Sequence, residues 1–159
     1  MVLTSDHGEL FERGIRGHVT PVLYEPVVRI PLMIFEPGRD TRTDIYDSTS
    51  AADILPTLLH VTGGKPADWT EGRVLPPFDR AETNRSIYSI HAMKNDPRAP
   101  LGQASVMLVN GRYKLMHIFG YPELPEKAGR TELYEVEADP EEMHDLYPEQ
   151  KQIGADLLD

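Results

Sequence analysis

The sequence contains no cysteine, which excludes disulfide bonds and thiolate metal ligands. It also lacks long apolar runs, and no stretch approaches the ~18 residues that a membrane-spanning helix needs. The first ten residues hold no basic segment followed by an apolar one, so they do not predict a signal peptide. We therefore expect neither a signal peptide nor a transmembrane segment in this chain.

Basic residues are scarce, with 16 lysines and arginines against 26 aspartates and glutamates. The resulting net charge of −10 repels nucleic-acid phosphates and anionic lipids, so neither a nucleic acid nor a membrane is expected as a partner. Hydrophobic residues make up 40% of the chain, which is enough to build a core. These features predict a folded, acidic protein that forms one compact domain or one and a half small ones.

The chain opens on a short apolar run, residues 2–5, which is typical of the end of a buried strand. A parallel core strand normally has neighbours on both sides, but only one residue precedes this run. We therefore expect the chain to begin in the middle of a larger fold.

The first half of the sequence predicts one strand and one helix. Residues 28–35 are apolar and β-branched and lie between prolines, which is typical of a strand. Residues 47–62 carry an apolar stripe at helical spacing, with Ser48 or Ser50 as the N-cap and two glycines at the end. This half therefore reads as one edge of an α/β sheet.

The second half predicts a small antiparallel sheet. Four short β-like runs occur at residues 86–90, 105–109, 113–118 and 132–136. Asn110-Gly111 between the second and third runs is a hairpin signal, and the tail is expected to be helical in two pieces separated by Pro148. The predicted fold class is thus α/β, with residues 1–83 forming the edge of the α/β sheet. Residues 84–159 form a small antiparallel sheet with a C-terminal helix.

The most informative stretch is Thr-Ser-Asp-His-Gly-Glu at residues 4–9. Within a strand, neighbouring side chains point to opposite faces, so Asp6 and His7 could not bind one ion there. Past the strand end, Gly8 lets the backbone turn, and both side chains can face the crevice where open α/β sheets place ligands. A carboxylate and an imidazole together suit a divalent ion. For an isolated Asp-His pair, a helix N-cap beside a solvated histidine is the alternative.

Further segments follow this stretch in a fixed order. They are Gly-His at 17–18, Leu-Tyr-Glu at 23–25, Val-Arg-Ile-Pro-Leu at 28–32, Asp-Ile-Leu-Pro-Thr-Leu-Leu at 53–59, Gly-Arg-Val-Leu-Pro at 72–76, the strand pair at 109–115 and Glu-Leu-Tyr-Glu-Val at 132–136. The ordered set resembles the sulfatase family of the alkaline phosphatase superfamily, and the resemblance covers nearly the whole chain. It implies the C-terminal portion of an alkaline-phosphatase-like α/β fold.

The resemblance also implies roles for individual residues. Asp6 and His7 match metal ligands of that family, usually for Ca²⁺, with Mn²⁺ or Zn²⁺ as alternatives that a histidine leaves open. His18 falls where the family places a basic residue that contacts the sulfate or the leaving oxygen, which makes it the candidate catalytic residue. Its alternative is a solvent-facing loop histidine. Glu9 is interpreted as supporting the loop.

The nucleophile that the resemblance implies is missing from this sequence. Sulfatases of this type carry it in a Cys/Ser-x-Pro-x-Arg motif, and this chain has neither a cysteine nor such a motif. We therefore expect the full-length parent to be a sulfuric ester hydrolase acting on a sulfate ester, and the isolated chain to be inactive.

Three other interpretations stay open at this point. A phosphoester or phosphonate hydrolase, or a phosphoglycerol transferase, would use the same scaffold. A non-catalytic binding or assembly module could form a homo-oligomer through its truncated sheet edge, because an unpaired edge is a template for strand pairing. The third is an unrelated acidic α/β protein with a fortuitous Ser-Asp-His-Gly-Glu.

Overall fold

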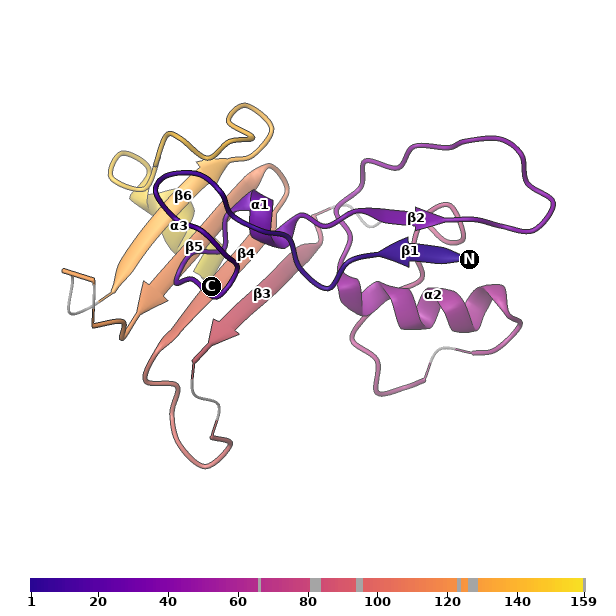
Figure 1. Cartoon of the computed structure of the whole chain (residues 1–159), viewed down its shortest axis with the longest axis horizontal. Coiled ribbons are helices and arrows are strands. Elements are labelled where there is room, and N and C mark those ends of the chain that lie inside the picture. Colours follow the sequence, from indigo (N-terminus) through magenta and orange to yellow (C-terminus); the bar gives the residue numbers. More distant parts are fainter. Residues whose placement is uncertain (66, 81–83, 94–95, 123, 126–128, 159) are drawn as a thin grey trace. The chain divides into compact units, whose positions relative to one another are not determined.

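A computed structural model describes the chain except residues 66, 81–83, 94–95, 123, 126–128 and 159. The chain forms two compact units, which are described separately below. The first consists of Met1–Arg39 together with Tyr88–Asp159, and the second of Asp40–Ile87. Figure 1 shows the helices and strands in chain order.

These compact units differ from the two sequence segments expected above, because residues 1–39 pack with the later sheet. The expected boundary, residue 83, lies outside the described residues. The division of the parent protein into parts 1–83 and 84–159 therefore stays a prediction.

The first unit is built on a four-stranded antiparallel sheet, which confirms the four β-like runs. Its strands in spatial order are β3 (Ser86–Ala92), β4 (Ala104–Asn110), β5 (Tyr113–Phe119) and β6 (Arg130–Glu135). Asn110 pairs with Tyr113, so the two residues of the hairpin turn are Gly111 and Arg112, one position later than the Asn-Gly signal implied. Gly111 has a φ of 56°, a conformation that glycine adopts without strain.

One face of this sheet carries the core of the unit. Met107, Met116 and Ile118 point to it from neighbouring strands, since they are register partners or alternate along one strand. Against them pack buried residues of the N-terminal segment, Leu10, Val22, Leu23, Tyr24 and Val27. Each such side chain contributes about 1.5–3 kcal/mol when fully buried. The N-terminal segment is therefore held on the sheet by its own apolar residues.

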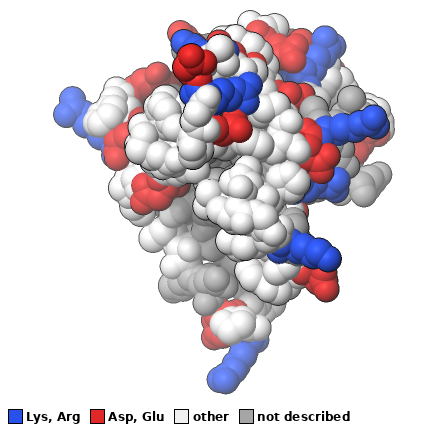
Figure 2. All heavy atoms as spheres, turned by 90° about the vertical axis from the view of Figure 1, so that its right-hand side faces the viewer, with Lys and Arg blue, Asp and Glu red and all other residues white. Residues whose placement is uncertain are grey.

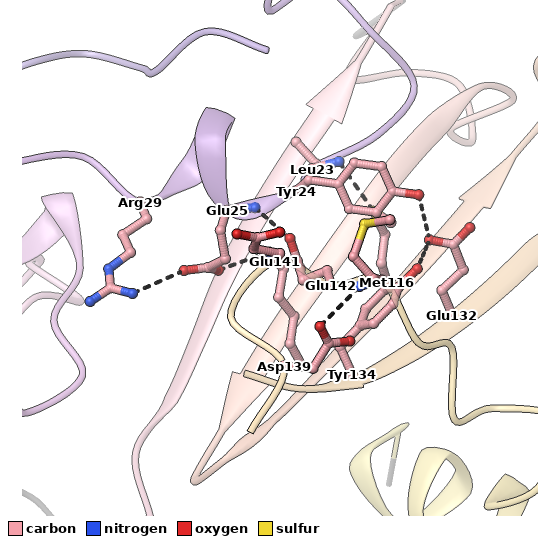
Figure 3. A network of polar contacts seen from close by, with 12 residues as sticks. Leu23, Tyr24, Glu25, Arg29, Met116, Glu132, Tyr134, Asp139, Glu141 and Glu142 are labelled. Carbon is pink, nitrogen blue, oxygen red and sulfur yellow. Dashed lines mark hydrogen bonds and ion pairs between the residues drawn. The ribbon is translucent and has the colours of Figure 1, made fainter. Parts of the chain in front are cut away.

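Buried polar groups add specific contacts at the same interface. The Tyr24 and Tyr134 hydroxyls both donate to Glu132 Oε2, at 3.1 and 2.9 Å, and Figure 3 shows them converging on that carboxylate. Burial, and then the Glu132 charge, raises the pKa of both phenols, so they remain protonated donors. These bonds tie the N-terminal segment to β6.

Lys114 of β5 is fully buried between two carboxylates. Its Nζ lies 2.9 Å from Glu25 Oε1 and 2.7 Å from Glu142 Oε1. Glu142 also accepts the backbone N–H of Glu25 at 2.6 Å (Figure 3). Burial raises the pKa of the Glu142 carboxyl, and the Lys114 ammonium offsets this only in part. The three charges join β5, the C-terminal tail and the short helix α1 (Glu25–Val28).

The tail departs from the prediction of two helical pieces. Over residues 139–158, the described part of the tail, there is a single helix, α3 (Lys151–Leu158), preceded by turns. The Asp139 carboxylate accepts the backbone N–H groups of Met143 and His144, and Glu142 has a φ of 52°. This left-handed residue and the capped turn end any helix that starts at Asp139.

The strand predicted over residues 28–35 is shorter in the structure. Only β2 (Leu32–Ile34) is a strand, and it pairs antiparallel with β1 (Val2–Thr4). Residues before Arg29 form α1 instead, because Pro26 fits the first turn of a helix. The expectation of a buried opening strand is wrong for this chain, since the register partners Leu3 and Met33 are 50% and 46% exposed.

The second unit contains the predicted helix, which confirms Ser50 as its cap. A 3-10 turn, η1 (Ala51–Asp53), leads into α2 (Ile54–Val61). The Ser50 hydroxyl accepts the Ala52 N–H, while the Asp53 carboxylate accepts the Ser50 N–H at 2.8 Å. This reciprocal capping box begins the helix.

Asp53 is also the polar centre of the second unit. Its fully buried carboxylate accepts two hydrogen bonds from Arg85, at 2.7 and 2.6 Å, and one from the Arg73 N–H at 2.9 Å. Four residues later, Thr57 Oγ1 accepts the Leu75 N–H at 2.9 Å. Burial favours the neutral acid, but the bonds from Arg85, Arg73 and Ser50 outweigh it and lower the pKa of Asp53. The Asp-Ile-Leu-Pro-Thr motif therefore fixes the Gly-Arg-Val-Leu-Pro loop onto the helix.

On the face drawn in Figure 2, acidic and basic side chains are interspersed. Within the described part of the chain, no helix is long and apolar enough to cross a membrane. The predictions that exclude nucleic-acid and membrane partners stay predictions.

Asp53→Ala should destabilise the second unit by about 3–5 kcal/mol, because it removes one partner of a buried ion pair. Urea unfolding followed by far-UV circular dichroism reports the loss. The ionised Asp53 carboxylate adds to the free energy of unfolding in full above the ordinary carboxyl pKa of 3.8. This stabilisation is lost as the pH falls through the lowered pKa of Asp53 in the folded state. Acid unfolding of the wild type should show this step.

The exposed Asp47 of the same unit provides the matched control, and Asp47→Ala should shift stability by less than about 0.5 kcal/mol. Equal effects of the two substitutions would contradict the central role of Asp53.

Candidate functional site

Gly8 anchors the segment that carries the candidate ligands. Its N–H donates to the carbonyl of Val27 in α1 at 2.8 Å. A Cβ atom at this position would overlap the carbonyl oxygen of Pro26. Glycine is therefore required here by the close approach of two backbones, rather than only by the sharp turn expected from the sequence.

The residues after Gly8 form a small hairpin loop that returns the chain to the site. Leu10 and Gly17 form an antiparallel bridge, with N–H to carbonyl distances of 3.2 and 2.9 Å. Between them, the Ile15 N–H donates to Glu12, and Arg13 and Gly14 have positive φ angles as in type I′ turns. Leu10 is fully buried in the core, so the loop is attached to the sheet of the first unit.

The bridge determines which side chains face each other. Glu9 precedes Leu10, and His18 follows Gly17, so these two residues are cross-strand neighbours. His18 Nδ1 lies 3.1 Å from Glu9 Oε2 and 3.4 Å from Oε1. Because a carboxylate only accepts, Nδ1 carries the proton and the Nε2 atom of His18 is left for another partner.

Asp6 and His7 lie close together at the start of the same segment. Asp6 Oδ2 is 3.7 Å from His7 Nε2, and Asp6 Oδ1 accepts the backbone N–H of His7 at 3.0 Å. The Nδ1 atom of His7 is 2.8 Å from the Gly8 carbonyl, which can only accept, so Nδ1 bears the proton. The lone pair of His7 Nε2 is therefore free on the side of the Asp6 carboxylate. This donor pair suits a divalent cation.

The two candidate histidines are in direct contact. Their rings stack with centroids 3.7 Å apart and planes 25° from parallel. Asp6, His7 and His18 therefore lie in one neighbourhood, although the Asp6 side chain is 89% exposed. Metal binding by Asp6 and His7 and substrate contact by His18 remain predictions.

Glu9 has a more specific position than the sequence suggested. It was expected to support the loop, and it does contact a candidate catalytic residue, His18. One donor atom from each of His7, Glu9 and His18 lies within 4.8 Å of the others. The sequence signal for this arrangement was the Glu-Arg-Gly-Ile turn at residues 12–15, which centres the hairpin that pairs positions 9 and 18.

Comparison with known families decides the relationship. Residues 19–157 match the family described as "N-sulphoglucosamine sulphohydrolase, C-terminal". The chain belongs to this sulfatase family. The resemblance inferred from the ordered motifs is thereby confirmed.

Curated sulfatases are similar over most of the chain. Arylsulfatase K of Mus musculus is 24% identical over 99% of this chain and 28% of its own length. The ulvan-active sulfatase of Formosa agariphila is 31% identical over 84% of this chain and 23% of its own length. The chain thus spans less than a third of the length of these relatives.

Solved structures share the fold of this sulfatase portion. A putative sulfatase from Bacteroides thetaiotaomicron matches 98% of the chain with a TM-score of 0.76 and 22% identity, over 33% of its own chain. A protein solved in complex with D-glucosamine-2-N,6-O-disulfate matches 99%, with a TM-score of 0.68, 23% identity and 32% of its own chain. The phosphonate monoester hydrolase of Agrobacterium radiobacter matches 97%, with a TM-score of 0.68, 21% identity and 32% of its own chain. These likenesses confirm the α/β fold class.

Gly8→Ala should separate the candidate ligands from α1, because the added Cβ overlaps the Pro26 carbonyl. We expect a loss of about 1–3 kcal/mol in unfolding free energy and shifted NMR resonances for His7 and Glu9. Gly14→Ala is the control, since a Cβ there meets nothing within 4 Å and the only cost is its positive φ. Unchanged His7 resonances in Gly8→Ala would refute the close-approach explanation.

Proposed function

We propose that this chain is the C-terminal portion of a sulfatase-type hydrolase whose full-length parent cleaves sulfate esters by metal-assisted nucleophilic attack. One observation carries the proposal: the free Nε2 lone pair of His7 lies 3.7 Å from the Asp6 carboxylate. Membership of the sulfatase family supports the reaction class. The names of the relatives, which include an arylsulfatase and an ulvan-active sulfatase, agree with a sulfate-ester substrate.

Asp6 and His7 would hold the divalent metal ion. A carboxylate oxygen and an imidazole nitrogen fit such an ion, and the Gly8 carbonyl fixes the His7 tautomer that leaves Nε2 available. When bound, the ion would neutralise negative charge on the sulfate oxygens. Ca²⁺ is the proposed ion, as in sulfatases generally, and His7 keeps Mn²⁺ and Zn²⁺ as alternatives. Two ligands alone bind such an ion weakly, so the remaining ligands must come from elsewhere in the parent protein.

His18 would contact the sulfate group or the leaving oxygen of the substrate. Its Nδ1 proton is bound by Glu9, so Nε2 is the atom directed to substrate. A protonated Nε2 donates a hydrogen bond to the oxygen on which charge develops as the ester bond breaks. The His7 ring, stacked on that of His18, holds the imidazole in place.

The attacking nucleophile is not in this chain, which has no cysteine and no Cys/Ser-x-Pro-x-Arg motif. We therefore propose that the isolated chain has no sulfatase activity of its own. Asp6, His7 and His18 would contribute to the parent enzyme by positioning the metal ion and a contact to the leaving group.

A phosphoester or phosphonate hydrolase, or a phosphoglycerol transferase, is the second candidate for the parent. The fold similarity to the phosphonate monoester hydrolase of Agrobacterium radiobacter supports keeping this candidate. The imidazole of His7 also suits Mn²⁺ or Zn²⁺ as well as Ca²⁺. Relative turnover of sulfate and phosphonate esters by the parent separates the two candidates.

The full-length parent, assayed with 4-nitrophenyl sulfate, should lose about 10²–10⁴-fold in kcat/KM on His18→Ala and at least about 10²-fold on Asp6→Asn or His7→Ala. His144→Ala is the control and should retain activity, because His144 is an exposed tail residue. The isolated chain should give no turnover. Hydrolysis by the pure isolated chain, or full activity of Asp6→Asn, would contradict the proposal.

A non-catalytic assembly module is the third candidate, and the exposed apolar residues Leu3 and Met33 on the β1–β2 ladder favour it. If this module forms homo-oligomers through that ladder, multi-angle light scattering should give a dimer mass that Leu3→Lys converts to the monomer mass. Phe11→Lys, at an exposed apolar residue outside the ladder, is the control. A concentration-independent monomer would remove this candidate.

A further inference from the structure

We infer that His7, Glu9 and His18 form a three-donor site for a first-row transition ion within this chain. The inference goes beyond the proposed function, in which the metal ligands are Asp6 and His7 while His18 contacts substrate. It depends on the loop geometry alone and stands whether or not the parent is a sulfatase.

The spacing of the donor atoms carries the inference. One atom from each of the three residues lies within 4.8 Å of the other two. Metal bonds of about 2.0–2.2 Å place neighbouring ligand atoms roughly 3 Å apart. His18 Nδ1 and Glu9 Oε2 are already 3.1 Å apart. An ion binds there when the neutral His18 imidazole changes tautomer: Nδ1 gives up its proton, Nε2 takes up a proton from solvent, and the Nδ1–Glu9 hydrogen bond is replaced by two metal–ligand bonds.

The third donor is His7, and its free atom is already defined. Nδ1 of His7 donates to the Gly8 carbonyl, which leaves the Nε2 lone pair as the donor. Metal-binding histidines usually have such a hydrogen bond on their second nitrogen, because it fixes the tautomer and the ring orientation. The ring stacks on that of His18 at 3.7 Å, and both rings are partly exposed, so their side chains have room to reorient toward one ion.

The backbone around these donors is already ordered. The Leu10–Gly17 bridge holds Glu9 opposite His18, and the Gly8–Val27 hydrogen bond holds the residue between His7 and Glu9. An ion therefore has to order only side chains, which lowers the entropy cost of binding. The side chains of His7 and His18 are each 41% exposed, so an ion can enter and keep water on its open positions.

The donor chemistry selects the class of ion. Two imidazoles and one carboxylate suit Zn²⁺, Mn²⁺ or Fe²⁺, while Ca²⁺ and Mg²⁺ prefer oxygen ligands. The Asp6–His7 pair and this site share His7 Nε2, so one ion occupies one of the two donor sets at a time. Asp6 belongs only to the first set, and Glu9 and His18 belong only to the second. Substitutions at these three residues therefore distinguish the two sets.

The test is calorimetric and NMR titration of the intact 159-residue chain with Zn²⁺ alone and, in parallel, Ca²⁺ alone. We expect one saturable Zn²⁺ site that is at least about tenfold tighter than Ca²⁺ binding. Glu9→Gln and His18→Ala should each weaken Zn²⁺ binding about 10–100-fold. Asp6→Asn should weaken it less than either of them does, because Asp6 lies outside this donor set. His144→Ala, with the same residue type in the tail, is the matched control and should bind as the wild type does.

Absence of saturable Zn²⁺ binding would overturn the inference. So would the reverse pattern, in which Asp6→Asn abolishes binding while Glu9→Gln and His18→Ala bind normally. That second result would leave the Asp6–His7 proposal intact, so the two failures are distinguishable. Backbone amide spectra of Glu9→Gln and His18→Ala that match the wild type outside residues 6–18 show that the variants fold. If either variant is misfolded, His18→Gln keeps a polar side chain without imidazole and should give the same loss.

Discussion

The antiparallel bridge between Leu10 and Gly17 is the interaction on which the candidate site depends. Its two backbone hydrogen bonds close a hairpin loop whose ends are Glu9 and His18. A third backbone bond, from Gly8 to Val27, attaches the start of that loop to α1. Without these bonds, an exposed acidic and histidine-containing segment would have many conformations, and ordering it would oppose any binding event.

The rest of the first unit supports this loop from behind. Leu10 is fully buried in the same hydrophobic cluster as the sheet residues Met116 and Ile118, so the bridge residue is part of the core. The Lys114 cluster fixes α1 through Glu25, and α1 provides the carbonyl that binds Gly8. The site is therefore on the surface, while its backbone is connected to the core in two places. This combination of exposed side chains and a backbone attached to the core suits a segment that has to position ligands.

The sequence predicted the features that depend on local pattern. Short β-like runs and a hairpin signal identified the strands of the sheet, and the Ser50 to Gly63 signals identified α2. The ordered motifs identified the sulfatase family, and some of them have a structural reason: Asp53, for example, forms a capping box and binds Arg85. Residue types at fixed spacing thus preserved information about contacts that are far apart in sequence.

Features that depend on distant contacts could not be predicted in the same way. Pro26 and the burial of Glu25 against Lys114 turn residues before Arg29 into a helix, although their β-branched composition favours a strand. The tail lost its first helical piece to capping by Asp139. The pairing of Glu9 with His18 depends on the bridge between Leu10 and Gly17, and the local sequence signal for that bridge is the Glu-Arg-Gly-Ile turn at residues 12–15. Asp6 and His7 were expected to meet, and their 3.7 Å separation is compatible with that expectation.

The central claim is that one fixed loop brings His7 and His18 together on the surface of this chain. Nuclear Overhauser measurements between imidazole ring protons of the intact protein test it most directly. The account predicts contacts between the His7 and His18 rings, which stack at 3.7 Å, and a slowly exchanging Nδ1 proton on His18 beside Glu9. Two rings with no mutual contact, and a His18 proton that exchanges as fast as that of the exposed His144, would contradict it.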